Sequence, residues 1–328
     1  MKYKKILSLI LTVFLFVLFF HFINFKQLIN MFEKLSWMSV VVATVLYFIS
    51  NYFRAERFRL LTDQQISLVQ MMQIVFFYGF YNKVLPLRTG EISYAVLMKK
   101  SNKSTFTESL SALLITRIYD IMSAFLLLLI ALFFARKAVS VINPALTAGL
   151  LAIIVVTLFN LPGVFKIIEL IFHKTLISGR FGLNSEKIQN YSDRITFLID
   201  WFTKANRSRT MLKLTVLSVL IWLSLYGTFF VLMNQLGSRL SYSMVIIGSV
   251  FANFSNLLPL SGIGGFGTME AGWAVGFTLI GLNRNDAIAS GIVVNMFIFL
   301  CTVCFAACGF LIAVYSKKYL QSFEKEDY

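Results

Sequence analysis

The amino-acid sequence predicts an all-α polytopic membrane protein with about six full spans and two re-entrant broken-helix hairpins, arranged as an inverted repeat. The 328 residues are 58% hydrophobic and only 14% charged, which is too few charged side chains to cover a water-soluble domain. Long apolar runs at residues 6–23, 38–53 and 123–134 have the character of membrane-spanning helices. Two further apolar segments are each interrupted by Leu-Pro-Leu followed by glycine, a combination that ends a helix.

The first predicted membrane repeat comprises residues 1–143. Residues 6–23 follow a basic N-terminus but lack a small-residue cleavage site after the apolar run, so we expect a retained first span rather than a signal peptide. Residues 38–53 form the second span, and residues 123–134 belong to the last span of this half. Between them, residues 70–98 contain N-K-V-L-P-L-R-T-G-E. Its proline and glycine predict a helix, a break and a returning helix.

The second predicted membrane repeat comprises residues 144–328 and has the same order of elements. Its hairpin, residues 242–282, contains N-L-L-P-L-S-G-I-G-G-F-G-T-M-E. Residues 161–213 form the longest polar segment and mix many cations with apolar spacing. We expect this segment to be a cytoplasmic amphipathic loop whose Lys and Arg side chains meet anionic inner-leaflet lipids.

The distribution of basic residues predicts the orientation. The chain carries 30 basic and 15 acidic residues, and most of the basic ones gather on one predicted side, including Arg54, Arg57 and Arg59 after the second span. Cytoplasmic loops of membrane proteins accumulate Lys and Arg, so we expect a multi-pass protein of the cytoplasmic (inner) membrane with both termini cytoplasmic. The two hairpins then enter from opposite sides, which is the inverted repeat. This bias accounts for the net charge of +15 without a nucleic-acid partner, and none is expected.

The candidate substrate-binding residues cluster at the two helix breaks and in the segment T-R-I-Y-D. Ionisable side chains in a membrane are energetically unfavourable, so each of them calls for a reason. The candidates are Asn82, Lys83, Arg88, Glu91, Arg117, Asp120, Asn256, Gly264, Gly265, Gly267 and Glu270.

One interpretation of these charges is purely structural. Arg117 and Asp120 are three residues apart on one helical face, and Arg88 and Glu91 have the same spacing. Each pair would then neutralise itself and have no further role.

The alternative interpretation is a polar cavity for an anionic lipid headgroup. Arg88 offers a planar fork of donors suited to phosphate, and Lys83 adds a second cation. A helix that restarts after G-I-G-G-F-G also points free amide hydrogens at an anion. Asp120, Glu91 and Glu270 would alternatively exchange protons to drive transport.

Neither catalysis nor a cofactor is expected from the remaining sequence. Cys301, Cys304 and Cys308 share a face of an apolar helix, where small side chains ease helix contact, so we assign no disulfide and no metal. The chain has only two histidines and no D-x-D cluster. No catalytic residue and no cofactor-binding residue is assigned.

The three motifs together resemble the lysylphosphatidylglycerol synthase transmembrane-region family, which includes the flippase domain of multiple-peptide-resistance proteins. The resemblance rests on N-K-V-L-P-L-R-T-G-E, T-R-I-Y-D and L-L-P-L-S-G-I-G-G-F-G-T-M-E and covers nearly the whole chain. Members often carry Glu immediately before the arginine of the second motif, where this chain has Thr116.

The resemblance implies an integral membrane protein that handles lipids. It does not imply lysyl transfer, which belongs to a separate soluble domain in the family. We expect a lipid flippase or transporter that moves an anionic lipid, either a phospholipid or a polyprenyl-phosphate-linked lipid. The alternative is a membrane accessory protein or an enzyme of lipid-linked glycan biosynthesis. In the accessory case, a glycosyltransferase or another envelope-biosynthesis enzyme would be the partner.

Overall fold

The computed structural model describes residues 30, 33–62, 66–85, 90–101, 104–135, 149, 152–153, 207–255 and 266–326. Every regular element within these residues is an α-helix, which agrees with the predicted all-α class. The helices are α3 (Trp37–Leu61), α4 (Leu68–Val84), α5 (Glu91–Lys100), α6 (Phe106–Phe134), α10 (Arg207–Gln235), α11 (Tyr242–Ser255), α12 (Thr268–Leu279) and α13 (Arg284–Glu326).

Side-chain caps set the starts of three helices in the first half. Ser36, Ser67 and Thr105 each accept a hydrogen bond from a backbone N–H three residues later, at the starts of α3, α4 and α6. Such caps satisfy amide groups that have no partner inside the helix. In α6 the bond is reciprocal, because the Glu108 side chain accepts from the backbone N–H of Thr105 at 2.8 Å.

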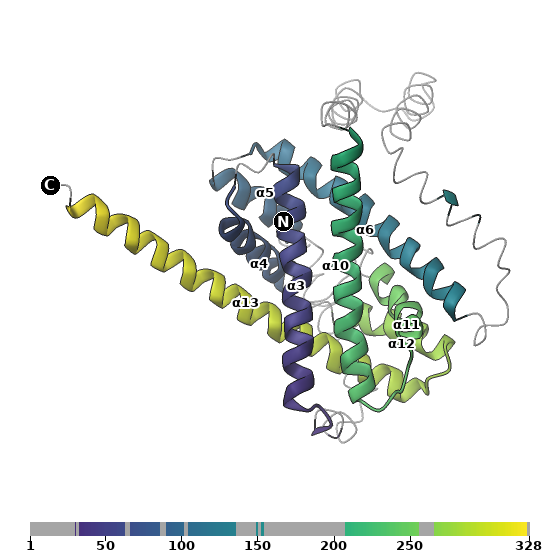
Figure 1. The fold of residues 1–328 in the computed structure, drawn as a ribbon. Coiled ribbons are helices and arrows are strands. Elements are labelled where there is room, and N and C mark those ends of the chain that lie inside the picture. The colour runs from purple at the N-terminus through teal and green to yellow at the C-terminus, as the bar shows by residue number, and fades with distance from the viewer. Residues whose placement is uncertain are drawn as a thin grey trace, which may run out of the picture.

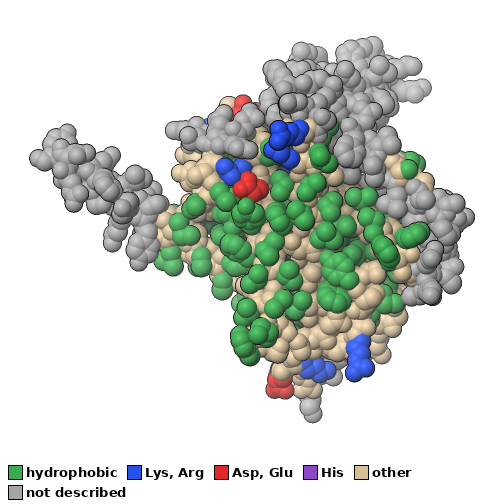
Figure 2. Space-filling view, viewed as in Figure 1, with side chains coloured by type: hydrophobic (Ala, Val, Ile, Leu, Met, Phe, Trp, Pro, Cys, Tyr) green, Lys and Arg blue, Asp and Glu red, His purple; other side chains and the backbone are tan. Residues whose placement is uncertain are grey.

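Within the described residues, four helices are long and apolar enough to cross a membrane. They are Trp37–Leu61, Glu108–Phe134, Arg209–Gln235 and Arg284–Val314. In Figure 2, apolar side chains cover the middle of the visible face, and charged side chains lie toward its upper and lower ends. Of the two other expected spans, residues 6–23 lie outside the described residues, as does almost all of the span expected just after residue 144. Most of the predicted loop 161–213 is also outside them, and α10 already begins at Arg207.

The helices α3 and α10 form an antiparallel pair at the front of the molecule in Figure 1. Their contacts begin where α3 starts and α10 ends, and finish where α3 ends and α10 starts. They include Ser39 with Gln235, Ala43 with Thr228, Ser50 with Ile221 and Arg57 with Ser218. The buried Ala43, Ser50 and Thr228 are small, which allows the two helices to approach closely.

Both predicted helix breaks are present. The helix α4 ends at Val84, and α5 begins at Glu91; α11 ends at Ser255, and α12 begins at Thr268. A Cβ atom at Gly90 would collide with the backbone of Tyr81 and Asn82, so the start of α5 lies directly against the last turn of α4. The breaking residues 86–89 and 256–265 are outside the described residues.

The contacts among the described helices follow the same pattern in both halves. The chain order of long helix, two short helices and long helix occurs as α3 to α6 and again as α10 to α13. Contacts of α3 with α4, α4 with α5 and α5 with α6 are matched by α10 with α11, α11 with α12 and α12 with α13. Between the halves, the contact of α4 with α13 is matched by that of α11 with α6.

The apolar interior is divided into two clusters with a polar zone at their border. One cluster includes Phe58, Met71, Tyr94 and Ile115, mainly from the first half, and the other is centred on Trp273 and the helices around it. The long helices α3, α6 and α10 contribute to both clusters, and their middle turns line the polar zone. The candidate functional site lies there.

Candidate functional site

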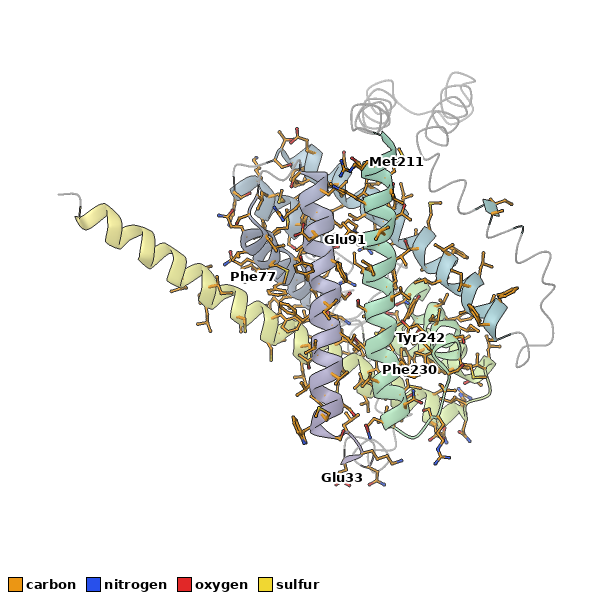
Figure 3. All side chains as sticks on the ribbon, viewed as in Figure 1. Glu33, Phe77, Glu91, Met211, Phe230 and Tyr242 are labelled. Carbon is orange, nitrogen blue, oxygen red and sulfur yellow. The ribbon has the colours of Figure 1, made fainter. Side chains whose placement is uncertain are left out.

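A cavity of about 250 Å³ lies at this polar zone, and all eight described helices contribute to its wall. Asn82 and Lys83 come from the last turn of α4, Glu91 from the first turn of α5, and Arg117 and Asp120 from the middle of α6. In Figure 3, Glu91 is labelled between the ribbons of α3 and α10 as they appear in this view. The other lining residues are Tyr47, Arg54, Arg57, Phe58, Tyr78, Gly79, Thr116, Ile121, Ala124, Trp222, Leu225, Phe229, Asn253, Phe254, Met269 and Ile298.

The wall carries an excess of positive charge. Its cations are Arg54, Arg57, Lys83 and Arg117, and its carboxylates are Glu91 and Asp120. Four cations against two carboxylates leave two positive charges in excess among the described lining residues. Such an excess inside an apolar bundle favours an anionic occupant.

Asp120 forms its ion pair with Arg57 of α3. The Nη1 and Nη2 atoms of Arg57 donate to the two carboxylate oxygens at 2.7 and 3.1 Å, which is the bidentate geometry. Arg57 Nη1 also donates to Ser218 of α10 at 2.8 Å, and the Arg57 side chain is 3% exposed. The structural interpretation of the sequence, which paired Asp120 with Arg117, is therefore wrong about the partner. Spacing within one helix does not reveal a partner that reaches in from another.

Arg117 instead pairs with Glu91. Its Nη2 atom lies 2.5 Å from Glu91 Oε1 and 3.5 Å from the hydroxyl oxygen of Tyr78. This contact ties the middle of α6 to the first turn of α5, directly after the helix break. Arg88, the other partner considered for Glu91, lies outside the described residues.

A hydrogen-bonded chain connects the two helix breaks. Lys83 Nζ donates to Asn295 Oδ1 at 2.8 Å, and Asn295 Nδ2 donates to Glu270 Oε1 at 2.7 Å. The other oxygen of Glu270 accepts from the backbone N–H of Gly267 at 2.7 Å, which caps the start of α12. Gly267 has a φ of 92°, a conformation that favours glycine. Asn295 is fully buried and Glu270 nearly so, and the chain thus joins α4 of the first half to α12 and α13 of the second.

The structure places the predicted site residues in three groups. Asn82, Lys83, Glu91, Arg117 and Asp120 line the cavity. Gly267 and Glu270 belong to the chain that holds Lys83 and are not part of the cavity wall. Four residues lie outside the described part: Arg88, Asn256, Gly264 and Gly265.

Sequence reasoning missed Arg54, Arg57, Trp222 and Asn295. The apolar run stops at residue 53, so the sequence predicts that the two arginines follow the second span. In the structure, α3 continues to Leu61 and includes both. The signal that could have identified them is their spacing, since Asn51, Arg54 and Arg57 recur every three residues on one helical face. No sequence pattern points to Asn295. It lies in an apolar stretch, and the nearest charged residue before it is Asp286.

A family model described as lysylphosphatidylglycerol synthase TM region matches residues 5–306. A search of curated proteins and a search of solved structures each found no significant match.

Proposed function

The chain belongs to the lysylphosphatidylglycerol synthase transmembrane-region family, and from this membership and the cavity we propose that it is a lipid flippase. It binds the headgroup of an anionic lipid, either a phospholipid or a polyprenyl-phosphate-linked lipid, and carries it across the cytoplasmic membrane. The protein acts as a transporter rather than as an enzyme.

One observation carries this proposal: a cavity with an excess of cations lies inside a bundle of apolar helices and is lined by both broken-helix pairs. Cations within a membrane are unfavourable unless they are matched by an opposite charge. The wall carries four cations and two carboxylates, and Glu270, which is outside the wall, also acts on Lys83. The net positive charge of the wall is complementary to an anionic headgroup.

The matched helix contacts support an inverted repeat with two re-entrant hairpins. In transporters of this class, broken helices from two inverted halves meet around a central site, and rocking of one half against the other exposes that site to each side in turn. Here α3 and α10, the equivalent helices of the two halves, run antiparallel. Such an arrangement is expected if the second half is inserted in the opposite orientation.

The orientation and partners belong to the same proposal. Both termini lie on the cytoplasmic side, and the basic segment 161–213 contacts anionic inner-leaflet lipids. The same segment is where a glycosyltransferase or another envelope-biosynthesis enzyme would dock if the protein serves as an accessory subunit.

Transport in liposomes tests the function directly. Purified protein is reconstituted in phosphatidylcholine vesicles that contain phosphatidylglycerol labelled on an acyl chain, and dithionite quenches the label of the outer leaflet. We expect the wild-type protein to expose the inner-leaflet label. The double variant Arg117→Gln/Glu91→Gln removes the cavity ion pair without leaving either charge unpaired, and should slow exposure at least about tenfold.

The matched control is Arg59→Gln/Glu56→Gln, which removes an ion pair on α3 whose atoms lie 2.9 Å apart, outside the cavity wall. It should transport at the wild-type rate. Wild-type vesicles that expose label no faster than protein-free vesicles would refute the proposal. Turnover of a lipid-linked sugar donor by the purified protein would favour an enzyme instead.

A further inference from the structure

The helices α3 and α10 form one wall of the cavity. This wall carries three donor groups that have no hydrogen-bond acceptor within the described part of the chain. Arg54 lines the cavity and makes no hydrogen bond or ion pair with any described residue. The Nε atom of Arg57 and the Nε1 atom of Trp222 are buried and have no partner there. Arg57 itself is only 2% exposed.

These donors lie close together. Arg54 and Arg57 are three residues apart on one face of α3. Arg57 Nη1 bonds Ser218 at 2.8 Å, and Trp222 lies one turn after Ser218 on the same face of α10. The three residues therefore line the cavity from two adjacent helices.

The chemistry of these groups selects an acceptor. Guanidinium and indole nitrogens donate hydrogen bonds and accept none. A buried donor without an acceptor is costly, and its presence calls for a missing partner. The complementary ligand atom is an oxyanion with several acceptor oxygens.

The charges around this wall also favour an oxyanion as the ligand. Both terminal nitrogens of Arg57 are held by Asp120, so Arg57 offers only its Nε–H, whereas Arg54 offers its whole guanidinium fork. The charge of Arg54 acts on both Lys83 and Asp120, which line the same cavity.

We propose that Arg54, Arg57 Nε and Trp222 Nε1 form the site that binds the phosphate group of the transported lipid. This inference rests on the proposed function and adds the group that is recognised and the wall that recognises it. The site lies on the contact between the two halves rather than on the proline-glycine breaks.

Calorimetric titration of the detergent-purified full chain tests the site with three probes: dioctanoyl phosphatidylglycerol, dioctanoylglycerol and inorganic phosphate. The wild-type protein should bind the phosphatidylglycerol more tightly than dioctanoylglycerol, which has the same chains but no phosphate. Arg54→Gln removes the charge, and Trp222→Phe removes the indole N–H while it keeps an aromatic ring. Each should weaken phosphatidylglycerol binding about tenfold and leave dioctanoylglycerol binding unchanged.

Two control variants match these changes outside the cavity. Arg59→Gln lies on the same helix, and Trp37→Phe removes the indole N–H of a residue that is 73% exposed. Both should bind phosphatidylglycerol as the wild-type protein does. Unchanged affinity in Arg54→Gln and Trp222→Phe would overturn the proposed site. Tighter binding of inorganic phosphate than of the lipid, lost in the same variants, would assign the site to free phosphate and overturn the lipid interpretation.

Transport separates this inference from the proposed function. If the wild-type protein moves phosphatidylglycerol in vesicles but Arg54→Gln binds it normally, only the phosphate site is wrong. If no lipid is transported while Arg54→Gln weakens binding, the transport proposal is wrong and the binding site stands.

Discussion

Arg57 lies in the apolar interior and serves acceptors on two other helices, Asp120 of α6 and Ser218 of α10. A buried ion pair of this kind is sensitive to the loss of either member, because the remaining charge is left without compensation. The Asp120 side chain is 20% exposed toward the cavity, so the pair also forms part of the wall that faces a ligand.

Removing one member of this pair should destabilise the protein strongly. We expect Asp120→Leu to cost about 3–5 kcal/mol of unfolding free energy, since it leaves Arg57 buried and unpaired. In the double variant Arg57→Met/Asp120→Leu, most of that loss should be recovered. The measurement is a double-mutant cycle on thermal or denaturant unfolding in detergent.

The control cycle combines Asp120→Leu with Arg117→Met. Arg117 has its own carboxylate partner, Glu91, and its coupling to Asp120 should be smaller than that of Arg57. Equal coupling in the two cycles would show that Asp120 interacts with both arginines alike and would contradict the pairing described above.

At the scale of elements, two glycines allow the short helices α11 and α12 to pack closely against each other. A Cβ atom added at Gly276 of α12 would collide with the carbonyl oxygen of Gly248 in α11 and lie 3.1 Å from the Phe251 ring. A Cβ atom at Gly248 would meet the ring of Phe277 at 2.9 Å. The two short helices of the second half can therefore approach this closely only because both positions lack a side chain.

Gly276→Ala should force α11 and α12 apart. We expect a loss of about 1–3 kcal/mol of stability, the usual range for an overpacked interface, and a lower melting temperature in detergent. The control is Gly309→Ala in α13, where the nearest atom to an added Cβ would be 3.6 Å away, an ordinary contact. A melting temperature for Gly276→Ala no lower than that of Gly309→Ala would contradict the close approach of α11 and α12.

The sequence was most informative about where helices break and least informative about where they continue past polar residues. Proline and glycine act locally, so the ends of α4 and α11 could be predicted from Leu-Pro-Leu alone. The continuation of α3 through Arg54 and Arg57 depends on partners that are distant in the chain, since Asp120 is 63 residues away from Arg57. The residues of the candidate site also fall into those that the sequence indicates and those that only the packed structure reveals. Lys83, Glu91, Arg117 and Asp120 stood out near motifs, whereas Asn295 stands out only once the helices are packed.

At the scale of the whole molecule, the proposed inverted repeat predicts which junctions between helices face which side of the membrane. In Figure 1 the junction of α5 with α6 lies at the upper end of the bundle, and the junction of α12 with α13 lies at the lower right. If the two halves are inserted in opposite orientations, these equivalent junctions face opposite sides of the membrane. The Lys and Arg residues near the first junction, Lys99 and Lys100, predict that it faces the cytoplasm.

Cysteine labelling in intact cells tests this sidedness. In a variant whose Cys301, Cys304 and Cys308 are replaced, Asn285→Cys should react with an impermeant thiol reagent, whereas Lys100→Cys should be protected. Both native residues are exposed in the structure, so accessibility to the reagent depends on the side of the membrane. Permeabilised cells should label both. Reaction of Lys100→Cys from outside intact cells would contradict the predicted topology.

The antiparallel seam between α3 and α10 has an evolutionary consequence under the proposed repeat. It joins the helices that the repeat makes equivalent, and among the described helices no other prominent contact pairs a helix with its own equivalent. A half-length ancestor able to insert in either direction would meet a second copy of itself along this seam, as an isologous dimer. After duplication and fusion, the two sides of the seam are free to diverge.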